Sequence, residues 1–205
     1  MKRLIIATHN NDKGVEFRTM LSGSGVEVLT LDSFPSIGAI PETGETLEEN
    51  SLLKADAVYR ATGLPSLADD TGLEVFYLAM APGVCSSRYA GEGASYADNV
   101  AKLLRAMKGV PARRRGARFR CVLTFMAPGC PPAATDGVCK GNILEAPRGG
   151  AGFGYDPVFL PSGADRAFAE LDPESKNAIS HRGRAMQKMR LLLNEYFNGA
   201  TVPVK

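Results

Sequence analysis

The feature that most restricts the fold of this chain is an alternation of short apolar runs with helical patterns in its first 70 residues. Residues 3–7 (RLIIA), residues 26–31 (VEVLTL) and the run that begins at Pro65 are typical of strands, and helical patterns separate them. No internal repeat, low-complexity linker or break in composition divides the 205 residues. We therefore predict an α/β fold in which residues 1–205 form a single domain, with room for two lobes.

Helix start signals divide the chain further. A helix over about 47–61 follows Thr46 and Glu49, which have the spacing of a capping box. The other expected starts are Asp12 as N-cap of a helix with Phe17, Met20 and Leu21 on its apolar face, Ser95 with Asp98, Asp172 with Pro173, and a last helix over about 183–197.

Two later segments are expected to add strands. Residues 118–126 (RFRCVLTFM) alternate in hydropathy, which places Phe119, Cys121, Leu123 and Phe125 on one face. Residues 136–147 (DGVCKGNILEAP) predict a hairpin-like pair of strands that turns at Gly141 and Asn142.

Composition excludes several classes of protein. Hydrophobic residues make up 44% and the net charge is +2, so no large field favours nucleic acid or a membrane surface as partner. The run from Arg113 to Arg115 is expected to be a solvated loop. The four cysteines form no C-x-x-C pair, and the apolar run at the N-terminus is too short for a signal peptide. We expect a cytoplasmic protein with no membrane partner.

The first polar loop, THNNDK, follows a strand and precedes a helix. Ligands of open α/β sheets bind at such strand ends, and helix N-termini favour anions. Thr8 and Asn10 offer hydrogen bonds, and Lys13 can reach a phosphate group. The loop has neither the Walker pattern nor the G-x-G-x-x-G pattern, so alone it predicts either a phosphate site or a capping loop.

Asp69 and Asp70 stand side by side where a strand is expected, although Asp is depleted in strands. In an extended segment the two side chains point to opposite faces, so they cannot act together as one acid–base pair. A second carboxylate must come from Glu42 or from Glu45, Glu48 or Glu49. Carboxylates without an organised His/Cys set indicate a hard cation such as Mg²⁺.

Two further segments carry candidate ligand-binding residues. In GAGFGYDPVFL, the glycines at 152 and 154 permit close backbone approach, and Phe153 or Tyr155 could stack on a planar base; a structural turn is the alternative. In ESKNAISHRGRAM, donors gather at Lys176, Ser180, His181 and Arg182, without the pattern of a catalytic triad.

Taken together, the segments ATHNNDKGVEF, ETGETLEENSLLKA, LADDTGLEV, GVCSSRYAG, PRGGAGFGYDPVF and KNAISHRGRA closely resemble the Ham1 or RdgB-like inosine/xanthosine triphosphate pyrophosphatase family. The resemblance runs from about residue 4 to residue 195. It implies a two-lobed α/β fold with an elongated mixed sheet flanked by helices, a nucleotide cleft between the lobes, and a homodimer. It also implies Mg²⁺-dependent hydrolysis of ITP, dITP and XTP to the monophosphate and pyrophosphate.

The resemblance also implies roles for individual residues. Asp70 is the expected proton acceptor, and Glu42 and Asp70 are the expected metal ligands. Asp69 is expected to face the other way and to support the loop or the surroundings of the metal. Thr8, Asn10 and Lys13 are the expected triphosphate ligands, with Lys54 as a further phosphate contact, and the other expected substrate-binding residues at this end are His9, Asn11, Asp12 and Thr71. The expected base-binding residues are Phe153, Gly154, Tyr155 and Asp156, with Lys176, His181 and Arg182 as donors to the base.

His9 departs from the Gly or Ser that is more usual in the family, and Asp12 follows an extra Asn. Three alternatives stay open at this point. They are a catalytically silent nucleotide-binding module, a Maf-like pyrophosphatase of other specificity, and an RNA-binding protein that uses Arg113 to Arg115. The carboxylates at 42 and 70 favour the enzyme, and the near-neutral charge disfavours RNA binding.

Overall fold

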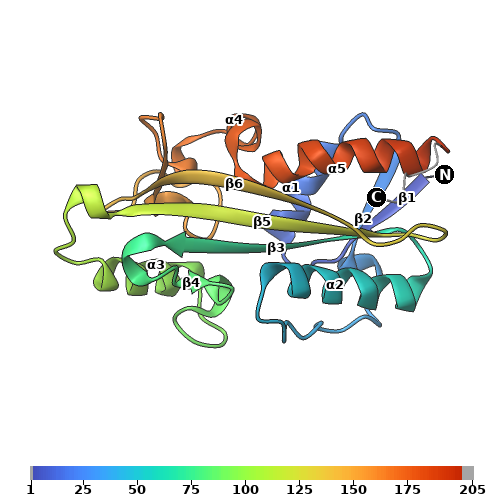
Figure 1. The fold of residues 1–205 in the computed structure, drawn as a ribbon, viewed down its shortest axis with the longest axis horizontal. Coiled ribbons are helices and arrows are strands. Elements are labelled where there is room, and N and C mark those ends of the chain that lie inside the picture. The colour runs from blue at the N-terminus through green and yellow to red at the C-terminus, as the bar shows by residue number, and fades with distance from the viewer. Residues whose placement is uncertain (1, 200–205) are drawn as a thin grey trace. The chain divides into compact units, whose positions relative to one another are not determined.

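The computed structural model describes residues 2–199, which form an α/β fold with a mixed sheet (Figure 1). The strand order is β2-β1-β3-β5-β6-β7, and β4 pairs with β3. The elements are β1 (Lys2–Ile6), α1 (Asn11–Leu21), β2 (Val26–Thr30), α2 (Leu47–Thr62), β3 (Ser66–Val75), β4 (Pro82–Gly83), α3 (Tyr96–Ala106), β5 (Gly116–Met126), β6 (Ala133–Ile143), β7 (Phe159–Pro161), α4 (Pro173–Ile179) and α5 (His181–Phe197). The predicted fold class is confirmed.

The chain divides into two compact units. Unit 1 contains residues 2–70, 121–137 and 182–199, and unit 2 contains residues 71–120 and 138–181. Strands β3, β5 and β6 each contribute residues to both units. At the start of α5, His181 belongs to unit 2 and the next residue, Arg182, belongs to unit 1. Whether the chain behaves as a single domain stays a prediction.

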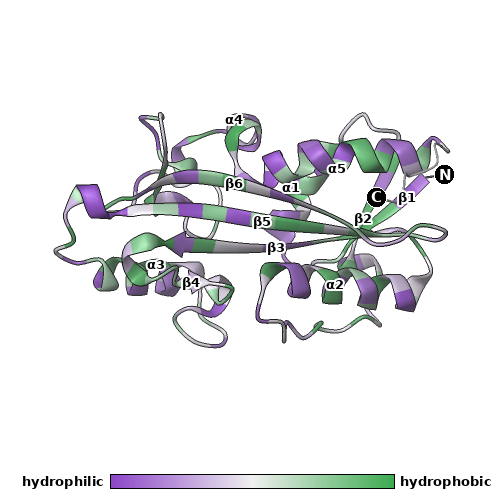
Figure 2. Cartoon of the chain, viewed as in Figure 1, coloured by the Kyte–Doolittle hydropathy of each residue, from purple (hydrophilic) through white to green (hydrophobic). Residues whose placement is uncertain are grey.

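In unit 1, helices lie on both faces of the strands. β1 pairs in parallel with β2 and with β3, and its central residues are completely buried. Helices α1 and α5 pack together on one face through Phe17, Met20, Met186 and Met189, whereas α2 packs on the other through Ala55 and Val58 (Figure 1). Figure 2 shows hydrophobic and hydrophilic stretches alternating along α5, as expected for a helix with one buried face.

In unit 2, an aromatic core joins strands and helices. Phe119 on β5 contacts Phe159 at 4.7 Å between ring centroids, and both lie near Phe168. Leu103 on α3 and Met107 just after it are completely buried in the same cluster. Antiparallel pairing of β6 with β7 covers a further edge of this core.

Several expectations about local structure are confirmed. Both predicted capping boxes form, Thr46 with Glu49 at α2 and Ser95 with Asp98 at α3. Asp172 caps α4, with Pro173 as its first residue. The four alternating residues of β5 are all buried.

Three local predictions are wrong. Asn10, rather than Asp12, is the N-cap of α1, because its side chain accepts the hydrogen bond from the Lys13 amide. No turn forms at Gly141 and Asn142, since β6 continues to Ile143 and pairs there with β7. Glycine is required at 141 for a different reason: a Cβ there would lie 2.3 Å from the Leu160 carbonyl oxygen.

The third correction concerns the basic run at 113–115. Arg113 and Arg114 are exposed, but Arg115 is buried, so the segment is not a wholly solvated loop. The Arg115 guanidinium donates to the carbonyl groups of Met107, Val110, Ile143 and Leu144. It joins the end of α3 to the end of β6, which gives it a structural role in unit 2.

Candidate active site

The first polar loop of unit 1 forms the N-terminus of α1. The Asn10 side chain accepts from the Lys13 amide at 3.1 Å, and the Thr8 hydroxyl accepts from the Asn10 amide at 3.0 Å. Asn11 and Asp12 are exposed in the first turn of the helix. The turn therefore presents amide groups and the Lys13 side chain at the end of β1, an arrangement that favours an anion.

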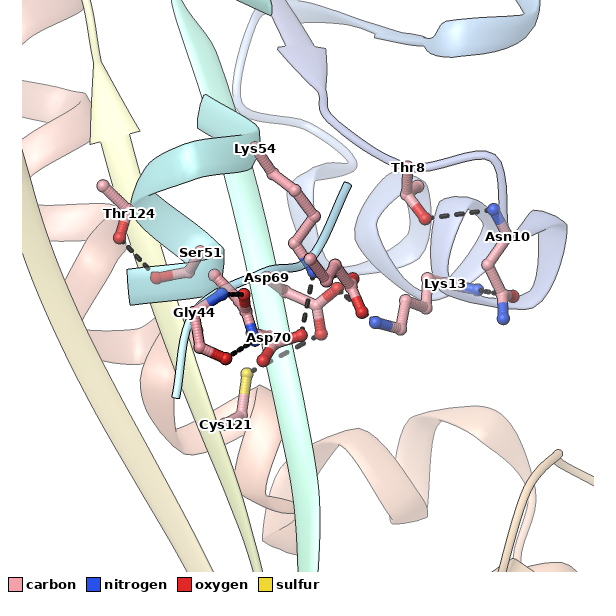
Figure 3. A network of polar contacts seen from close by, with 12 residues as sticks. Thr8, Asn10, Lys13, Gly44, Ser51, Lys54, Asp69, Asp70, Cys121 and Thr124 are labelled. Carbon is pink, nitrogen blue, oxygen red and sulfur yellow. Dashed lines mark hydrogen bonds and ion pairs between the residues drawn. The ribbon is translucent and has the colours of Figure 1, made fainter. Parts of the chain in front are cut away.

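Lys13 is anchored by one of the paired aspartates. Its ammonium group lies 2.8 Å from Asp69 Oδ1, and Asp69 is almost completely buried on β3 (Figure 3). Burial opposes ionisation of Asp69, but the charges of Lys13, Arg182 and Lys54 outweigh it and hold the pKa of Asp69 well below its usual value. Asp69 is thus a fixed negative charge that orients Lys13.

Asp70 belongs to a second group of charges, around Lys54 on α2. The Lys54 ammonium lies 2.7 Å from Glu42 Oε1 and 2.9 Å from Asp70 Oδ1 (Figure 3). Burial raises the pKa of Asp70, because the attraction of Lys54 offsets only part of the cost of desolvation. Burial opposes ionisation of Glu42, but the charge and hydrogen bond of Lys54, together with the charge of Lys13, outweigh it and lower the pKa of Glu42. The cluster therefore contains carboxylates with opposite shifts in proton affinity.

Asp69 and Asp70 have different hydrogen-bond and ion-pair partners, although the charges of both act on Lys54. That their side chains point to opposite faces stays a prediction. Asp69 contacts Lys13, Arg182 and the Cys121 thiol, whereas Asp70 Oδ1 contacts Lys54. Asp70 Oδ2 is buried and has no hydrogen-bond partner within residues 2–199. A buried carboxylate oxygen without a hydrogen-bond partner is a candidate ligand for a cation or a water molecule.

Arg182 lies in this cluster of unit 1. Its guanidinium bonds to Asp69 Oδ2 at 2.9 Å and to Glu16 Oε2 at 2.5 Å, and only 2% of the residue is exposed. The sequence analysis did not identify Glu16 as a site residue. The available signal was that Glu16 lies three residues after Lys13 on one helix, a spacing that places two side chains on the same face. Together the four residues form a buried chain of alternating charge from Glu16 to Lys13.

In unit 2, the residues expected near the base gather around Phe153. Gly152 and Gly154 both have positive φ, and Asp156 Oδ2 accepts from the Phe153 amide at 2.9 Å. The Lys176 ammonium lies 2.5 Å from the same carboxylate oxygen and 4.7 Å from the centroid of the Phe153 ring. Lys176 and Asp156 are both buried, so this pair holds the glycine-flanked turn in place.

The other expected base-end residues have separate positions. Tyr155 is buried and its hydroxyl donates to the Ser86 carbonyl at 2.9 Å; burial raises its pKa. The His181 ring stacks on Phe119 with 4.5 Å between centroids. Thr71 is half-buried on β3. Tyr96, which the sequence analysis missed, lies 5.9 Å from the Phe153 ring.

Residues 2–199 contain no group of three His, Cys, Asp or Glu side chains that could hold a metal ion by themselves. Two carboxylates, Glu42 and Asp70, share Lys54, and they supply the oxygen atoms that hard cations prefer. Mg²⁺ keeps several waters and commonly shares its coordination between one or two carboxylates and substrate phosphates. The donor set and the buried Asp70 Oδ2 fit that kind of ion.

Comparisons with known proteins show that the chain is similar to members of one family. The model of the Ham1 family matches residues 4–192. A curated dITP/XTP pyrophosphatase of Geobacillus kaustophilus is 49% identical over 92% of this chain and 93% of its own, and one of Vibrio cholerae is 46% identical over 95% and 98%. The solved structure of a HAM1 protein from Coxiella burnetii has a TM-score of 0.85 and 41% identity, covering 95% of this chain and all of the other (100%).

Proposed function

Because the chain belongs to the Ham1 family, we propose that it is a nucleoside triphosphate pyrophosphatase that hydrolyses ITP, dITP and XTP. The products are the nucleoside monophosphate and pyrophosphate. The observation that carries this proposal is the buried group in unit 1, in which Lys13 and Lys54 stand beside Asp69, Asp70 and Glu42. Such a group combines cations for a phosphate chain with carboxylates for a metal ion and a proton.

The phosphate chain would bind at the N-terminus of α1. Thr8, Asn10 and Lys13 hold this turn together, and His9, Asn11 and Asp12 complete the loop. Lys13 and Lys54 would stabilise the charge that develops on the leaving pyrophosphate. Both ammonium groups are already held in place by carboxylates, so little reorganisation is needed when substrate binds.

Glu42 and Asp70 would hold Mg²⁺, together with phosphate oxygens and water. When bound, the ion neutralises charge on the phosphates and lowers the pKa of a nearby water. Lys54 keeps the two carboxylates near each other, because its ammonium contacts both. Asp69 is satisfied by Lys13 and Arg182, and its role is to support the loop.

Asp70 would accept the proton of the attacking water. Its pKa is raised by burial, which makes the carboxylate a better proton acceptor than an exposed aspartate. The water oxygen forms a bond to the α-phosphorus as the bond from that phosphorus to the bridging oxygen breaks. Pyrophosphate then leaves with the electron pair of the broken bond.

Base recognition would involve Phe153, Gly154, Tyr155, Asp156, Lys176 and His181 in unit 2. Thr71, which follows Asp70, would be a further substrate-binding residue. Hypoxanthine and xanthine carry an acceptor at position 6, where adenine carries a donor. A donor that faces this position therefore disfavours adenine by leaving two donors opposed. Arg182 was also expected to donate to the base, but its guanidinium is bound to Asp69 and Glu16, so we assign it to positioning Asp69.

Two further parts of the proposal rest on the family rather than on the site. We propose that the protein forms a homodimer and acts in the cytoplasm. Within the described residues, no helix is long and apolar enough to cross a membrane, and all four cysteines are free thiols.

The experiment that tests the function is pyrophosphate release from ITP, dITP, XTP, GTP, ATP and the pyrimidine nucleotides CTP and UTP, with and without Mg²⁺. We expect strong metal-dependent turnover of the first three and little of the others. Turnover of pyrimidine nucleotides instead would point to a Maf-like specificity. Binding of ITP without turnover would identify a silent nucleotide-binding module.

A further inference from the structure

Glu42 lies in a segment with no helix or strand, between residue 34 and the start of α2. Its carboxylate must nevertheless reach Lys54, from which it lies 2.7 Å away. We call residues 38–44 the Glu42 loop. The position of a metal ligand in an irregular segment depends on what holds that segment at each end.

At its C-terminal end the loop is held by Asn50, which is completely buried on α2. The Asn50 Oδ1 accepts from the Gly44 amide at 2.8 Å, and the Asn50 Nδ2 donates to the Gly44 carbonyl at 3.3 Å. Figure 3 marks these two bonds at Gly44 with dashed lines. One side chain thus satisfies both polar groups of a residue two positions from Glu42.

At its N-terminal end the loop is held by His9. The His9 Nε2 lies 3.1 Å from the Gly38 carbonyl oxygen, which can only accept, so Nε2 carries the hydrogen. His9 stands between Thr8 and Asn10, which hold the turn that begins α1. The contact therefore links the turn before α1 to the start of the Glu42 loop.

We propose that His9 and Asn50 are positioning residues that together set where the Glu42 carboxylate lies relative to Asp70, and so set the affinity for Mg²⁺. Neither side chain needs to touch the ion. This inference rests on the proposed function in so far as Glu42 is a metal ligand. It predicts that weakening either contact raises the Mg²⁺ requirement more than it lowers the maximal rate.

The chain offers a matched control in the residue after Asn50. Ser51 is also completely buried on α2, and its hydroxyl lies 2.6 Å from that of Thr124 on β5 (Figure 3). Ser51→Ala removes a buried hydrogen bond from the same helix without releasing the Glu42 loop. It separates a general loss of stability from a loss of positioning.

The test compares Asn50→Ala, His9→Ala and Ser51→Ala in two measurements. The first is the Mg²⁺ concentration that gives half-maximal ITP hydrolysis. We expect it to rise roughly ten-fold for Asn50→Ala and about three-fold for the exposed His9→Ala, and we expect Asn50→Ala to recover its rate at saturating Mg²⁺. For Ser51→Ala we expect no change beyond about two-fold.

The second measurement is hydrogen exchange of the amides of residues 38–46 in the protein without nucleotide. Protection should fall in Asn50→Ala and His9→Ala and be kept in Ser51→Ala. Unchanged protection and Mg²⁺ dependence in folded His9→Ala and Asn50→Ala would overturn the inference. If the wild type failed to hydrolyse ITP, the proposed function would be wrong. Loss of amide protection in Asn50→Ala and His9→Ala would still show that the two side chains hold the Glu42 loop.

Discussion

Unit 1 holds a chain of ion pairs between buried charged side chains, whereas in unit 2 one buried ion pair lies against aromatic rings. Lys13, Asp69, Arg182 and Glu16 form one chain of ion pairs in unit 1. In unit 2 the Lys176–Asp156 pair lies against the rings of Phe153 and Phe168. The first arrangement suits phosphates and a metal ion, and the second suits a flat, uncharged base.

The comparison also shows how far neighbours in sequence can differ in surroundings. His181 stacks on Phe119 in the core of unit 2, while Arg182, the next residue, is bound to two carboxylates in unit 1. Asp70 and Thr71 are divided between the units in the same way. Adjacent residues of one sequence motif can therefore lie in two different units, with different surroundings.

The largest expected effect is that of Asp70→Asn, which tests the chemical role of unit 1. Asparagine keeps the size of the side chain but cannot accept the proton of water, so kcat for ITP should fall by about 10² to 10⁴. Binding of ITP should be retained. Asp136→Asn is the control, because Asp136 is paired on the surface of the same unit with Lys188. Normal hydrolysis by Asp70→Asn would remove Asp70 from the reaction.

The next effect is on stability, and it concerns the charge chain of unit 1. Arg182→Met would leave Asp69 and Glu16 buried without their shared cation, and loss of one partner of a buried ion pair costs about 3–5 kcal/mol. Urea unfolding of the variant at neutral pH measures this change. A decrease of less than about 1 kcal/mol in the free energy of unfolding would show that these ion pairs are exposed to solvent in the native protein.

A smaller effect is expected for Phe153→Ala in unit 2. Base–aromatic stacking is worth about 1–3 kcal/mol, so KM for ITP should rise roughly ten-fold or more. The Mg²⁺ dependence should not change, since the proposed metal ligands lie in unit 1. Steady-state kinetics at several Mg²⁺ concentrations separate the two parameters. A change confined to the Mg²⁺ requirement would contradict the assignment of Phe153 to the base.

The smallest effect concerns the capping box of α3 in unit 2. Ser95→Ala should cost about 1 kcal/mol of stability and leave ITP hydrolysis unchanged. Hydrogen bonds from Ser95 hold the pKa of Asp98 below its usual value. The contribution of Asp98 is therefore present above its unfolded pKa, about 4, and is lost as the pH falls through the lower folded value. Urea unfolding of Asp98→Asn and wild type should converge at acidic pH.

Much of the fold was predictable from local patterns. The capping boxes at Thr46 and Ser95, the N-cap at Asp172 and the apolar face of α1 depend on spacing over a few residues, and the structure confirms them. The predicted turn at Gly141 failed because the close approach of β7 is a contact between distant segments. The prediction that Arg115 lies in a solvated loop was wrong for the same reason, since the partners of its buried guanidinium include carbonyl groups of residues 143 and 144.

The candidate site shows the same limit. The residue types at 13, 42, 54 and 70 were visible in the sequence, but their pairing was not. Glu16 and Asn50 were missed because nothing in the sequence says that they face Arg182 and Gly44. Arg182 was expected at the base because its position matches the family motif, and its ion pairs with Asp69 and Glu16 became visible only in three dimensions.

The division of labour between the units is tested most directly by competition against ITP in the variants Lys13→Ala and Phe153→Ala. Tripolyphosphate carries only the phosphate chain, and inosine carries only the base and sugar. We expect Lys13→Ala to weaken inhibition by tripolyphosphate roughly ten-fold and to leave inhibition by inosine unchanged, with the reverse for Phe153→Ala. Equal weakening of both inhibitors in both variants would contradict the account.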